Sequence, residues 1–387
     1  MRVLVLAPHP FYQERGTPIA VDLLVRALCE RGDEVDLLTF HEGSDRRYEG
    51  LQIRRIKPFF RITDVPPGFS WKKIVCDVHL FGKFISLMFR NRYHVVHAIE
   101  EAGLMALVVC PLRRTPYVYD MDSSMTTQIV DKFTLMRPLE RVLRFMESLP
   151  MRYADAVVPV CDALAQEVHL YRTQNVVVLK DVSLLNGSGN GGNEKQLRDE
   201  LALRGKIAMY IGNLEAYQGI DLMLESFAAV REVNQDVELI VVGGADADIE
   251  KYKELAVNLR IGNYVHFLGR RPVSELGSLT AQADVLLSPR VQGVNTPMKI
   301  YSYLHSGTAV LATDSPTHTQ VMDDQIAMLA RPDRLAFADA MVHLLDDDAK
   351  RTRLGVRARA YIEREHSYDT FRHKLHGLYS QLETSSV

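Results

Sequence analysis

The chain has 387 residues, a length that predicts two to three domains with sizeable cores. With 47% hydrophobic and 25% charged residues, the composition excludes wholesale disorder, collagen-like repeats and a coiled coil. The net charge of −3 argues against a nucleic-acid-binding protein. The four cysteines lie far apart and form no C-x-x-C pair, which excludes a disulfide scaffold and a zinc ribbon and fits a reducing compartment. No apolar window reaches 18 residues, so we expect a soluble, cytoplasmic protein.

Short apolar runs alternate with helical patterns along the first half of the chain. The opening MRVLVLAPHPF is typical of a first strand and not of a signal peptide. The runs predict strands at Val3–Ala7, Val35–Phe40, Val95–Ala98, Pro116–Tyr119 and Ala156–Val160, with a helix over Ile19–Arg31 after the first. Short strands separated by helices predict βαβ units and a parallel sheet covered on both faces.

The alternation stops at Asn186–Asn193, whose NGSGNGGN sequence predicts a flexible linker. It then resumes, which predicts a second α/β unit. Its predicted strands are Ile207–Ile211, Leu239–Val242, Val265–Leu268, Val285–Ser288 and Val310–Thr313, and its predicted helices are 220–230, 249–259 and 299–306. Ligands in such folds bind at the carboxyl edge of the sheet, so we expect a binding cleft between the edges of the two sheets.

The segment between Leu51 and Arg92 is locally basic within an acidic chain. It holds nine Lys or Arg, against Asp64 and Asp77. Seven aromatic residues are interleaved with them: Phe59, Phe60, Phe69, Trp71, Phe81, Phe84 and Phe89. Basic and aromatic residues together indicate a surface for an anionic membrane. The alternative is a solvated helix whose apolar side is ordinary core.

Three glycine-containing loops each follow a predicted strand and precede a helix. They are His9–Thr17 with Gly16, Tyr210–Gly219 with Gly212, and the run from Ala283 to Gly307. A glycine before a helix lets a phosphate approach the free N–H groups of the helix start. In the third loop we expect Pro297 at the first helical position. The backbone N–H groups of Asn295, Thr296 and Met298, with Lys299 beside them, would then meet an anion.

Taken in order, these segments resemble the family 4 glycosyltransferases of the GT-B architecture. The similarity also rests on ADAVVPVC at 154–161, VHFLGRRPVSEL at 265–276 and YIEREHSYDTF at 361–371. The resemblance implies an α/β fold of two Rossmann-like domains with parallel sheets facing a cleft. It implies an acceptor domain at 1–184, a linker at 185–204, a nucleotide-sugar domain at 205–365 and a helix at 366–387 that packs back on the first domain.

The family's donor-site residues are partly replaced. Where the family carries an Arg and a Lys toward the donor diphosphate, this chain has Asn213 and Gln218. Where the family has two glutamates, it has Val294, or Gln292 if the loop shifts, and Ser302. Replacement cations would come from Arg290, Lys299 or Arg271. The resemblance also implies that the base rests near Arg271 and the ribose near Ser302 and Lys299.

Candidate acceptor residues follow the strands of the first domain. Asp120-Met-Asp122 matches the D-x-D metal motif of the other glycosyltransferase architecture, but the GT-B resemblance implies no metal and no cofactor. Asp122 is a candidate active-site residue, or alternatively Asp122 or Ser123 is a plain helix cap. His97 and Glu100 are expected on a second loop, where they would contact the acceptor, and His9 on the first.

The sequence therefore predicts a retaining glycosyltransferase at the cytoplasmic membrane face. A UDP-sugar is favoured over a GDP-sugar as donor, and the expected acceptor is a glycan or a lipid-linked acceptor. The candidate catalytic residues are Asp122, His97 and Lys299. Two alternatives remain open: another GT-B enzyme such as a sugar-nucleotide epimerase or a phosphorylase, and a non-catalytic sugar-nucleotide or glycan-binding partner in polysaccharide assembly.

Overall fold

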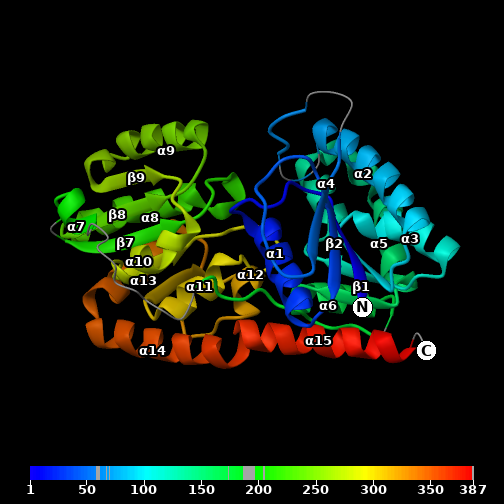
Figure 1. The fold of residues 1–387 in the computed structure, drawn as a ribbon. Helices are drawn as coiled ribbons and strands as arrows, with labels where there is room; N and C mark the ends of the chain where they lie inside the picture. The colour runs from blue at the N-terminus through cyan, green and yellow to red at the C-terminus, as the bar shows by residue number, and fades with distance from the viewer. Residues whose placement is uncertain are drawn as a thin grey trace. The chain divides into compact units, whose positions relative to one another are not determined.

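The computed structural model describes residues 1–57, 62–66, 68, 70–172, 174–185, 197–203 and 205–385. The chain divides into two compact units, Met1–Lys180 with Phe371–Val387, and Asp181–Thr370. Each unit is an α/β fold built on a six-stranded sheet (Figure 1). All strand pairs in both sheets are parallel. The predicted fold class, two Rossmann-like domains with parallel sheets, is confirmed.

The first sheet has the strand order β3-β2-β1-β4-β5-β6. In that order its strands are β3 (Leu51–Arg55), β2 (Glu34–Thr39), β1 (Arg2–Ala7), β4 (Val95–Ile99), β5 (Tyr117–Met121) and β6 (Ala156–Pro159). The first three strands are added toward one edge of the sheet and the next three toward the other, so the strand order reverses between β1 and β4. There Val3 pairs with both Val35 of β2 and Val95 of β4. Strand β3 carries no clean apolar run, and the sequence pattern missed it.

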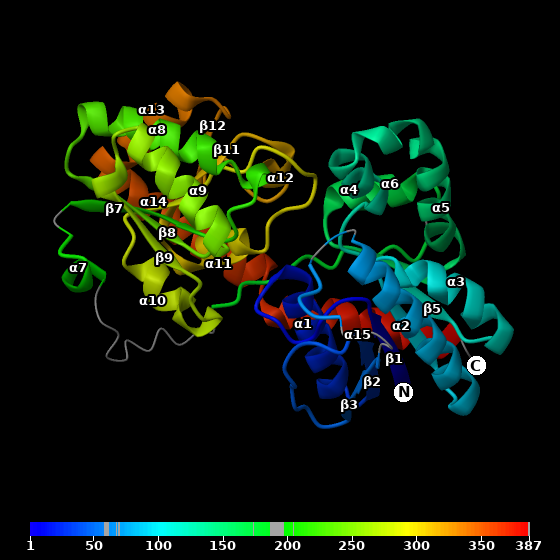
Figure 2. The same cartoon turned by 90° about the horizontal axis from the view of Figure 1, so that it is seen from above.

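Helices cover both faces of the first sheet. Leu4 and Leu6 of β1 share one core with α2 (Trp71–Arg90), α3 (Ala102–Arg113) and residues of α5 and α6. The intervening Val3 and Val5 face the other way, toward α1 (Gly16–Glu30) and the C-terminal α15 (Tyr368–Ser385) (Figure 2). The remaining helices of this unit are α4 (Met125–Lys132), the 3-10 helix η1 (Thr134–Leu139), α5 (Glu140–Tyr153) and α6 (Asp162–His169).

The second sheet has the order β12-β11-β10-β7-β8-β9, so its strand order reverses between β7 and β10. In that order the strands are β12 (Met328–Ala330), β11 (Ala309–Thr313), β10 (Val285–Ser288), β7 (Lys206–Ile211), β8 (Val237–Val242) and β9 (Val265–Gly269). The α-helices are α7 (Leu197–Glu200), α8 (Ile220–Val233), α9 (Asp246–Asn258), α10 (Leu276–Ala281), α11 (Lys299–Ser306), α12 (Pro316–Thr319), α13 (Arg334–Asp346) and α14 (Asp348–Glu365). Short 3-10 helices lie at η2 (Ala216–Gln218), η3 (Gly262–Tyr264) and η4 (Val273–Glu275).

The boundary between the units lies at Lys180, four residues before the position that the sequence indicated. Of the expected linker 185–204, residues 186–196 and 204 lie outside the described residues. Residues 197–203 are not a linker, because Leu197 and Leu203 are buried in the core of the second unit. Ser302 binds the segment that precedes residue 186, since its hydroxyl accepts a hydrogen bond from the N–H of Leu184 at 3.0 Å.

No helix in the described part of the chain is long and apolar enough to cross a membrane.

Candidate functional site

The second sheet places two loops side by side at its carboxyl edge. Strands β7 and β10 are neighbours at the reversal point, and the loop that follows each of them begins there. Open α/β sheets bind their ligands at this position. Gly219 brings the two loops into contact, because it has a φ of +74° and a Cβ there would collide with the Pro289 carbonyl. The close packing of backbone at Gly219 against Pro289 therefore fixes the two loops beside each other.

Gly212 and Tyr210 shape the loop after β7. Gly212 has a φ of +159°, and a Cβ on it would lie 3.2 Å from the Lys299 Nζ. The Tyr210 hydroxyl donates to the carbonyl of Asn213 at 2.6 Å, which fixes the turn. The Asn213 side chain reaches the hydroxyl of Tyr217 at 3.3 Å. Gly212 thus leaves open the space beside the lysine ammonium.

Lys299 is the cation at the centre of the site. Its Nζ lies 3.8 Å from the centre of the Tyr210 ring and donates to the Gln218 Oε1 at 3.4 Å. Burial lowers the pKa of Lys299 well below its ordinary value, and the charge of Arg290 lowers it further. Lys299, Gln218 and Gly212, which the sequence analysis names as candidates, are therefore neighbours in the structure. A ligand that brings negative charge stabilises the ammonium form of a lysine buried in this way.

Helix α11 has the predicted range, 299–306, but Pro297 does not lie at its first position. The helix begins at Lys299, and Pro297 lies two residues before it. The Pro297 carbonyl accepts from the N–H of Ile300 at 2.9 Å, so it closes the turn that leads into the helix. Tyr303 ties this helix to β7, because its hydroxyl accepts from the N–H of Ile211 at 2.6 Å and donates to the Ile211 carbonyl at 3.0 Å. Lys299 is thereby held at the carboxyl end of β7.

Arg290 adds a second, buried cation just beyond β10. Its Nε donates to the Gln292 carbonyl at 2.7 Å, and one terminal nitrogen donates to the Asn295 Oδ1 at 3.0 Å. The guanidinium also lies 5.1 Å from the centre of the Tyr217 ring. Burial lowers the pKa of Arg290 from its ordinary value. This arginine therefore both orders its own loop and brings positive charge toward Lys299.

The loop between Arg290 and Lys299 offers donors to a ligand. The Thr296 side chain is buried, and its Oγ1 has no hydrogen-bond partner among the described residues. In the same part of the chain, the backbone N–H groups of Asn295, Thr296 and Met298 have no protein acceptor. Backbone N–H groups beside two cations form a suitable site for a phosphate group.

His318 supports this loop, and the sequence reasoning missed it. Its Nε2 pairs with the Ser288 Oγ at 2.9 Å, and its Nδ1 pairs with the Thr313 Oγ1 at 3.0 Å. Thr313 in turn donates to the Arg290 carbonyl. Burial lowers the pKa of His318 to about 4, although its hydrogen bond to the Thr313 carbonyl opposes the shift. An isolated histidine gives no sequence signal, so only the fold could reveal its role.

Two residues expected at the donor site have no side-chain hydrogen bond or ion pair with Lys299 or Arg290 among the described residues. Ser302 is fully buried and bonded to Leu184, so its hydroxyl is committed to the protein backbone and does not face a ribose. Arg271 is exposed, and the described residues give it only an ion pair with Glu275 at 3.8 Å. The hypothesis of a replacement cation is therefore supported by geometry for Lys299 and Arg290 and not for Arg271.

The first unit places its candidate residues differently from the expectation. His97 lies within β4 and is fully buried, with Nε2 3.0 Å from the Asp120 Oδ2 and Nδ1 2.9 Å from the Tyr379 hydroxyl. It therefore links two strands to α15 and is not on a loop. Asp122 is half-buried just after β5, and the cap of α4 is Ser124, not Asp122 or Ser123.

The carboxyl edge of the first sheet gathers several charges. Gly16 begins α1, and the space beside it is open. Burial lowers the pKa of His9 to about 3. Lys73 is paired with Glu101, lies 3.9 Å from Asp77 and donates to the Pro8 carbonyl at 2.8 Å. These groups line the loop that follows β1.

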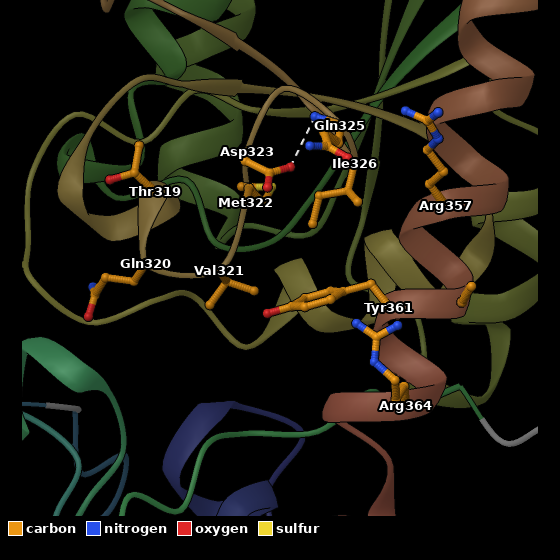
Figure 3. Close-up of a pocket in the computed structure, with 11 residues that line it drawn as sticks. Thr319, Gln320, Val321, Met322, Asp323, Gln325, Ile326, Arg357, Tyr361 and Arg364 are labelled. Carbon is orange, nitrogen blue, oxygen red and sulfur yellow. Dashed lines mark hydrogen bonds between the residues drawn. The ribbon is translucent and has the colours of Figure 1, made fainter.

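A separate cavity of about 660 Å³ lies between the loop after α12 and helix α14 (Figure 3). Residues 319–323, Gln325 and Ile326 line one side, and Arg357, Tyr361 and Arg364 line the other. Gln320 connects this cavity to the loop between Arg290 and Lys299, since its side chain donates to the Val294 carbonyl at 2.6 Å.

Comparison with known proteins decides the family. The model described as "Glycosyl transferase 4-like domain" matches residues 15–179, and "Glycosyl transferases group 1" matches residues 205–347. The chain belongs to the family 4 glycosyltransferases. The first match covers β2 to β6 of the first sheet, and the second covers all strands of the second sheet.

Relatives and solved structures agree with this family. The chain is 31% identical to a D-inositol 3-phosphate glycosyltransferase of Corynebacterium diphtheriae, over 41% of this chain and 38% of that protein. Its identity to the protein of that name in Corynebacterium efficiens is 23%, over 92% and 88%. A phosphatidyl-myo-inositol mannosyltransferase of Mycobacterium leprae is 29% identical over 47% and 48%.

Among solved structures, the fold is similar to sucrose-phosphate synthase from Thermosynechococcus elongatus, with a TM-score of 0.80, 18% identity and 99% of both chains covered. An Anabaena protein solved in complex with UDP-glucose has a TM-score of 0.77 and 15% identity, over 98% of this chain and 100% of that one. Together with the family matches, they identify the fold as GT-B.

Proposed function

We propose that this glycosyltransferase moves a sugar, with retention of configuration, from a UDP-sugar to a lipid-linked or phosphorylated acceptor at the cytoplasmic membrane face. The observation that carries the donor half is the arrangement of Lys299, Arg290 and the unpaired backbone N–H groups of the β10 loop. Cations and backbone N–H donors that lie close together bind the negatively charged oxygens of a diphosphate. UDP is favoured over GDP, as the sequence analysis indicates.

The chemistry follows from where charge develops. When the bond between sugar and diphosphate breaks, negative charge grows on the departing phosphate. The buried Lys299 carries its proton most readily when that charge is present, because burial and Arg290 otherwise disfavour the ammonium form. Interactions that strengthen during the reaction raise the rate and not only the affinity. Asn213 and Gln218 are neutral, so Lys299 takes over the role that cations at those positions have in the family.

The acceptor is proposed to bind at the carboxyl edge of the first sheet. The named relatives act on inositol 3-phosphate or phosphatidyl-myo-inositol. A phosphorylated polyol, free or attached to a lipid, therefore fits the family. Arg15 is the partly buried cation proposed to meet its phosphate there, and Asp122 is the proposed contact for its hydroxyl groups.

Membrane docking is proposed through the exposed part of the basic segment 51–92. That segment is not one continuous surface, because Arg54 is paired with Asp36, Arg55 with Asp45, and Phe84 is buried in the core. Phe59, Phe60, Arg61 and Phe69 lie outside the described residues. The exposed part is on α2, where Trp71, Ile74, Val78, Lys83, Phe89 and Arg90 are exposed, together with Arg92 just after the helix.

A second function has one observation in its favour. Val294 and Ser302, which stand at the family's glutamate positions, are an aliphatic residue and a buried hydroxyl. That pattern also fits a non-catalytic sugar-nucleotide-binding partner of a polysaccharide assembly system. Another GT-B activity, such as a sugar-nucleotide epimerase, would convert the donor without an acceptor.

One experiment separates these functions. The protein is titrated with UDP, GDP and ADP by calorimetry and is then incubated with UDP-glucose, with and without inositol 3-phosphate or phosphatidylinositol. The proposal expects UDP binding and acceptor-dependent release of UDP. UDP binding without turnover on any acceptor would support the binding partner, and donor conversion without acceptor would support the epimerase. If none of the nucleotides binds at millimolar concentration, the donor-site proposal is wrong.

A further inference from the structure

Helix α5 buries two polar residues and exposes three large apolar ones. Glu147 and Ser148 are buried, whereas Val142, Phe145 and Met146 are 54%, 58% and 44% exposed. A surface helix of a soluble protein normally shows the opposite arrangement. The exposed apolar face therefore calls for a partner outside this chain's own core.

The exposed apolar residues extend over the whole segment from Phe133 to Tyr153, which includes η1 and α5. Leu135 is 91% exposed and Leu139 is 48% exposed, and both terminal aromatic residues are exposed as well. Basic residues outnumber acidic ones among them: the segment has four arginines, at 137, 141, 144 and 152, and two glutamates. Glu147 is buried, and Glu140 is paired with Arg144 at 2.9 Å. The charge that this segment presents outward is therefore positive.

The segment is held firmly in this orientation. The buried Glu147 Oε1 accepts from the N–H of Met125 at 2.6 Å, and its Oε2 accepts from the Ser124 hydroxyl at 3.1 Å. These bonds attach α5 to the start of α4. On its other side α5 packs against α3, where a Cβ on Gly103 would meet Pro150 at 3.2 Å. The apolar side chains are thus exposed by a built structure and not by fraying of a helix end.

We propose that residues 133–153 form a lipid-docking face that inserts its apolar side chains among the headgroups of an anionic bilayer. Arginines interleaved with exposed aliphatic and aromatic residues, with the acidic residues buried or paired, fit an interface in which phosphates lie above acyl chains. A second copy of this chain fits less well, because a symmetric contact would bring together two faces that both carry positive charge. The inference extends the proposed membrane function to a surface outside segment 51–92.

Helix α3 connects this face to α2. It packs against α2 on one side and α5 on the other, on the same side of the first sheet (Figure 2). Its own exposed residues are Val108 and Leu112, followed by Arg113 and Arg114. Exposed residues of α2, α3 and α5 therefore share one layer of the first unit, which would bring the acceptor edge of that unit close to a lipid substrate.

The test is sedimentation with sucrose-loaded vesicles of phosphatidylglycerol and phosphatidylcholine, against phosphatidylcholine alone. The apolar variant combines Leu135→Ser, Val142→Ser and Phe145→Ser, and the charge variant combines Arg137→Gln with Arg141→Gln. The matched control combines Leu335→Ser and Val356→Ser, which are 63% and 65% exposed in the second unit. We expect tenfold or greater loss of vesicle binding in the apolar variant, about fivefold for each arginine in the charge variant, and no change in the control.

UDP titration of every variant keeps this result separate from the donor-site proposal, since all should bind UDP as the unmodified protein does. The sole tryptophan, Trp71, reports on α2 through its emission when vesicles are added. If both variants of segment 133–153 bind vesicles normally, or if the unmodified protein ignores anionic vesicles at low salt, the inference is wrong. It is also wrong if sedimentation equilibrium shows a dimer that the apolar variant abolishes.

Discussion

Replacing Lys299 with methionine removes the central cation while keeping a side chain of similar length. Nζ donates only a 3.4 Å hydrogen bond to Gln218 and rests on the Tyr210 ring, so the substitution leaves no buried carboxylate without a partner. Folding should therefore be preserved. A charge-assisted hydrogen bond to a phosphate contributes about 1.5–3 kcal/mol, which corresponds to a loss of about 10- to 150-fold in UDP affinity. Uridine has no phosphate, and its affinity should barely change.

The same lysine predicts a pH dependence of UDP binding. Burial and then Arg290 lower the pKa of Lys299 in the empty protein, and a bound diphosphate favours the ammonium form and raises that pKa. Binding therefore takes up a proton once the pH exceeds the pKa of the empty protein. UDP affinity should fall with rising pH, by up to about tenfold per pH unit. Measurements above about pH 7.5 avoid the titration of the terminal phosphate.

Calorimetric titration with UDP and uridine, from pH 7.5 upward as above, provides the assay. The matched control is Lys253→Met, an exposed lysine paired with Glu250 on α9. We expect Lys299→Met to lose affinity for UDP alone and to lose the pH dependence, and the control to behave as the unmodified protein. An equal loss for UDP and uridine would indicate a distorted site. Unchanged UDP binding would refute the role given to Lys299.

Three further predictions concern stability. His318 has a pKa of about 4 when folded and about 6.5 when unfolded, so the unfolded chain takes up more protons and stability is lost as the pH falls from about 6.5 to 4; denaturant titrations should show His318→Gln losing part, at most about 3 kcal/mol, of that dependence. Gly219→Ala should cost about 2–3 kcal/mol of unfolding free energy and weaken UDP binding, because of its positive φ and the neighbouring Pro289 carbonyl. The control Gly277→Ala on α10 should not destabilise, because its Cβ would make only an ordinary contact with Leu185 at 3.8 Å, and a neutral Gly219→Ala would contradict the packing. Tyr379→Phe should lower the free energy of unfolding by about 1–3 kcal/mol, because His97 Nδ1 loses its buried hydrogen-bond partner. An unchanged melting temperature would contradict that hydrogen bond.

The fold was predictable because its strands are buried on both faces. Runs such as Val3–Ala7 and Val285–Ser288 are continuously apolar, and both are strands in the structure. Strand β3 escaped prediction because its LQIRR sequence is half-buried at the sheet edge, and the three-residue β12 is too short to give a pattern. A run of apolar residues indicates a buried strand, and edge strands are less buried and so show no such run.

The proposed donor site was predictable to the level of its loops, and the surroundings of its individual residues less so. Gly212, Gln218, Arg290 and Lys299 come together because strand order brings the two loops to one edge. Ser302 was placed wrongly because helical spacing alone cannot show which face of α11 points to the core.

His97 and His318 show the same limit for buried polar residues. Both are isolated in sequence, and both acquire a role only through partners far along the chain, Tyr379 for one and Ser288 for the other. A hydrogen bond between residues so distant leaves no trace in local spacing. These positions could be assigned only from the folded structure.

Amide hydrogen exchange with and without UDP tests the central claim most directly, because it locates the nucleotide on the chain without a variant. The account predicts that saturating UDP slows exchange in the loops at 212–219 and 291–298, with little change in the first unit. Protection confined to other segments, or no protection in these two loops at saturation, would contradict a donor site built around Lys299.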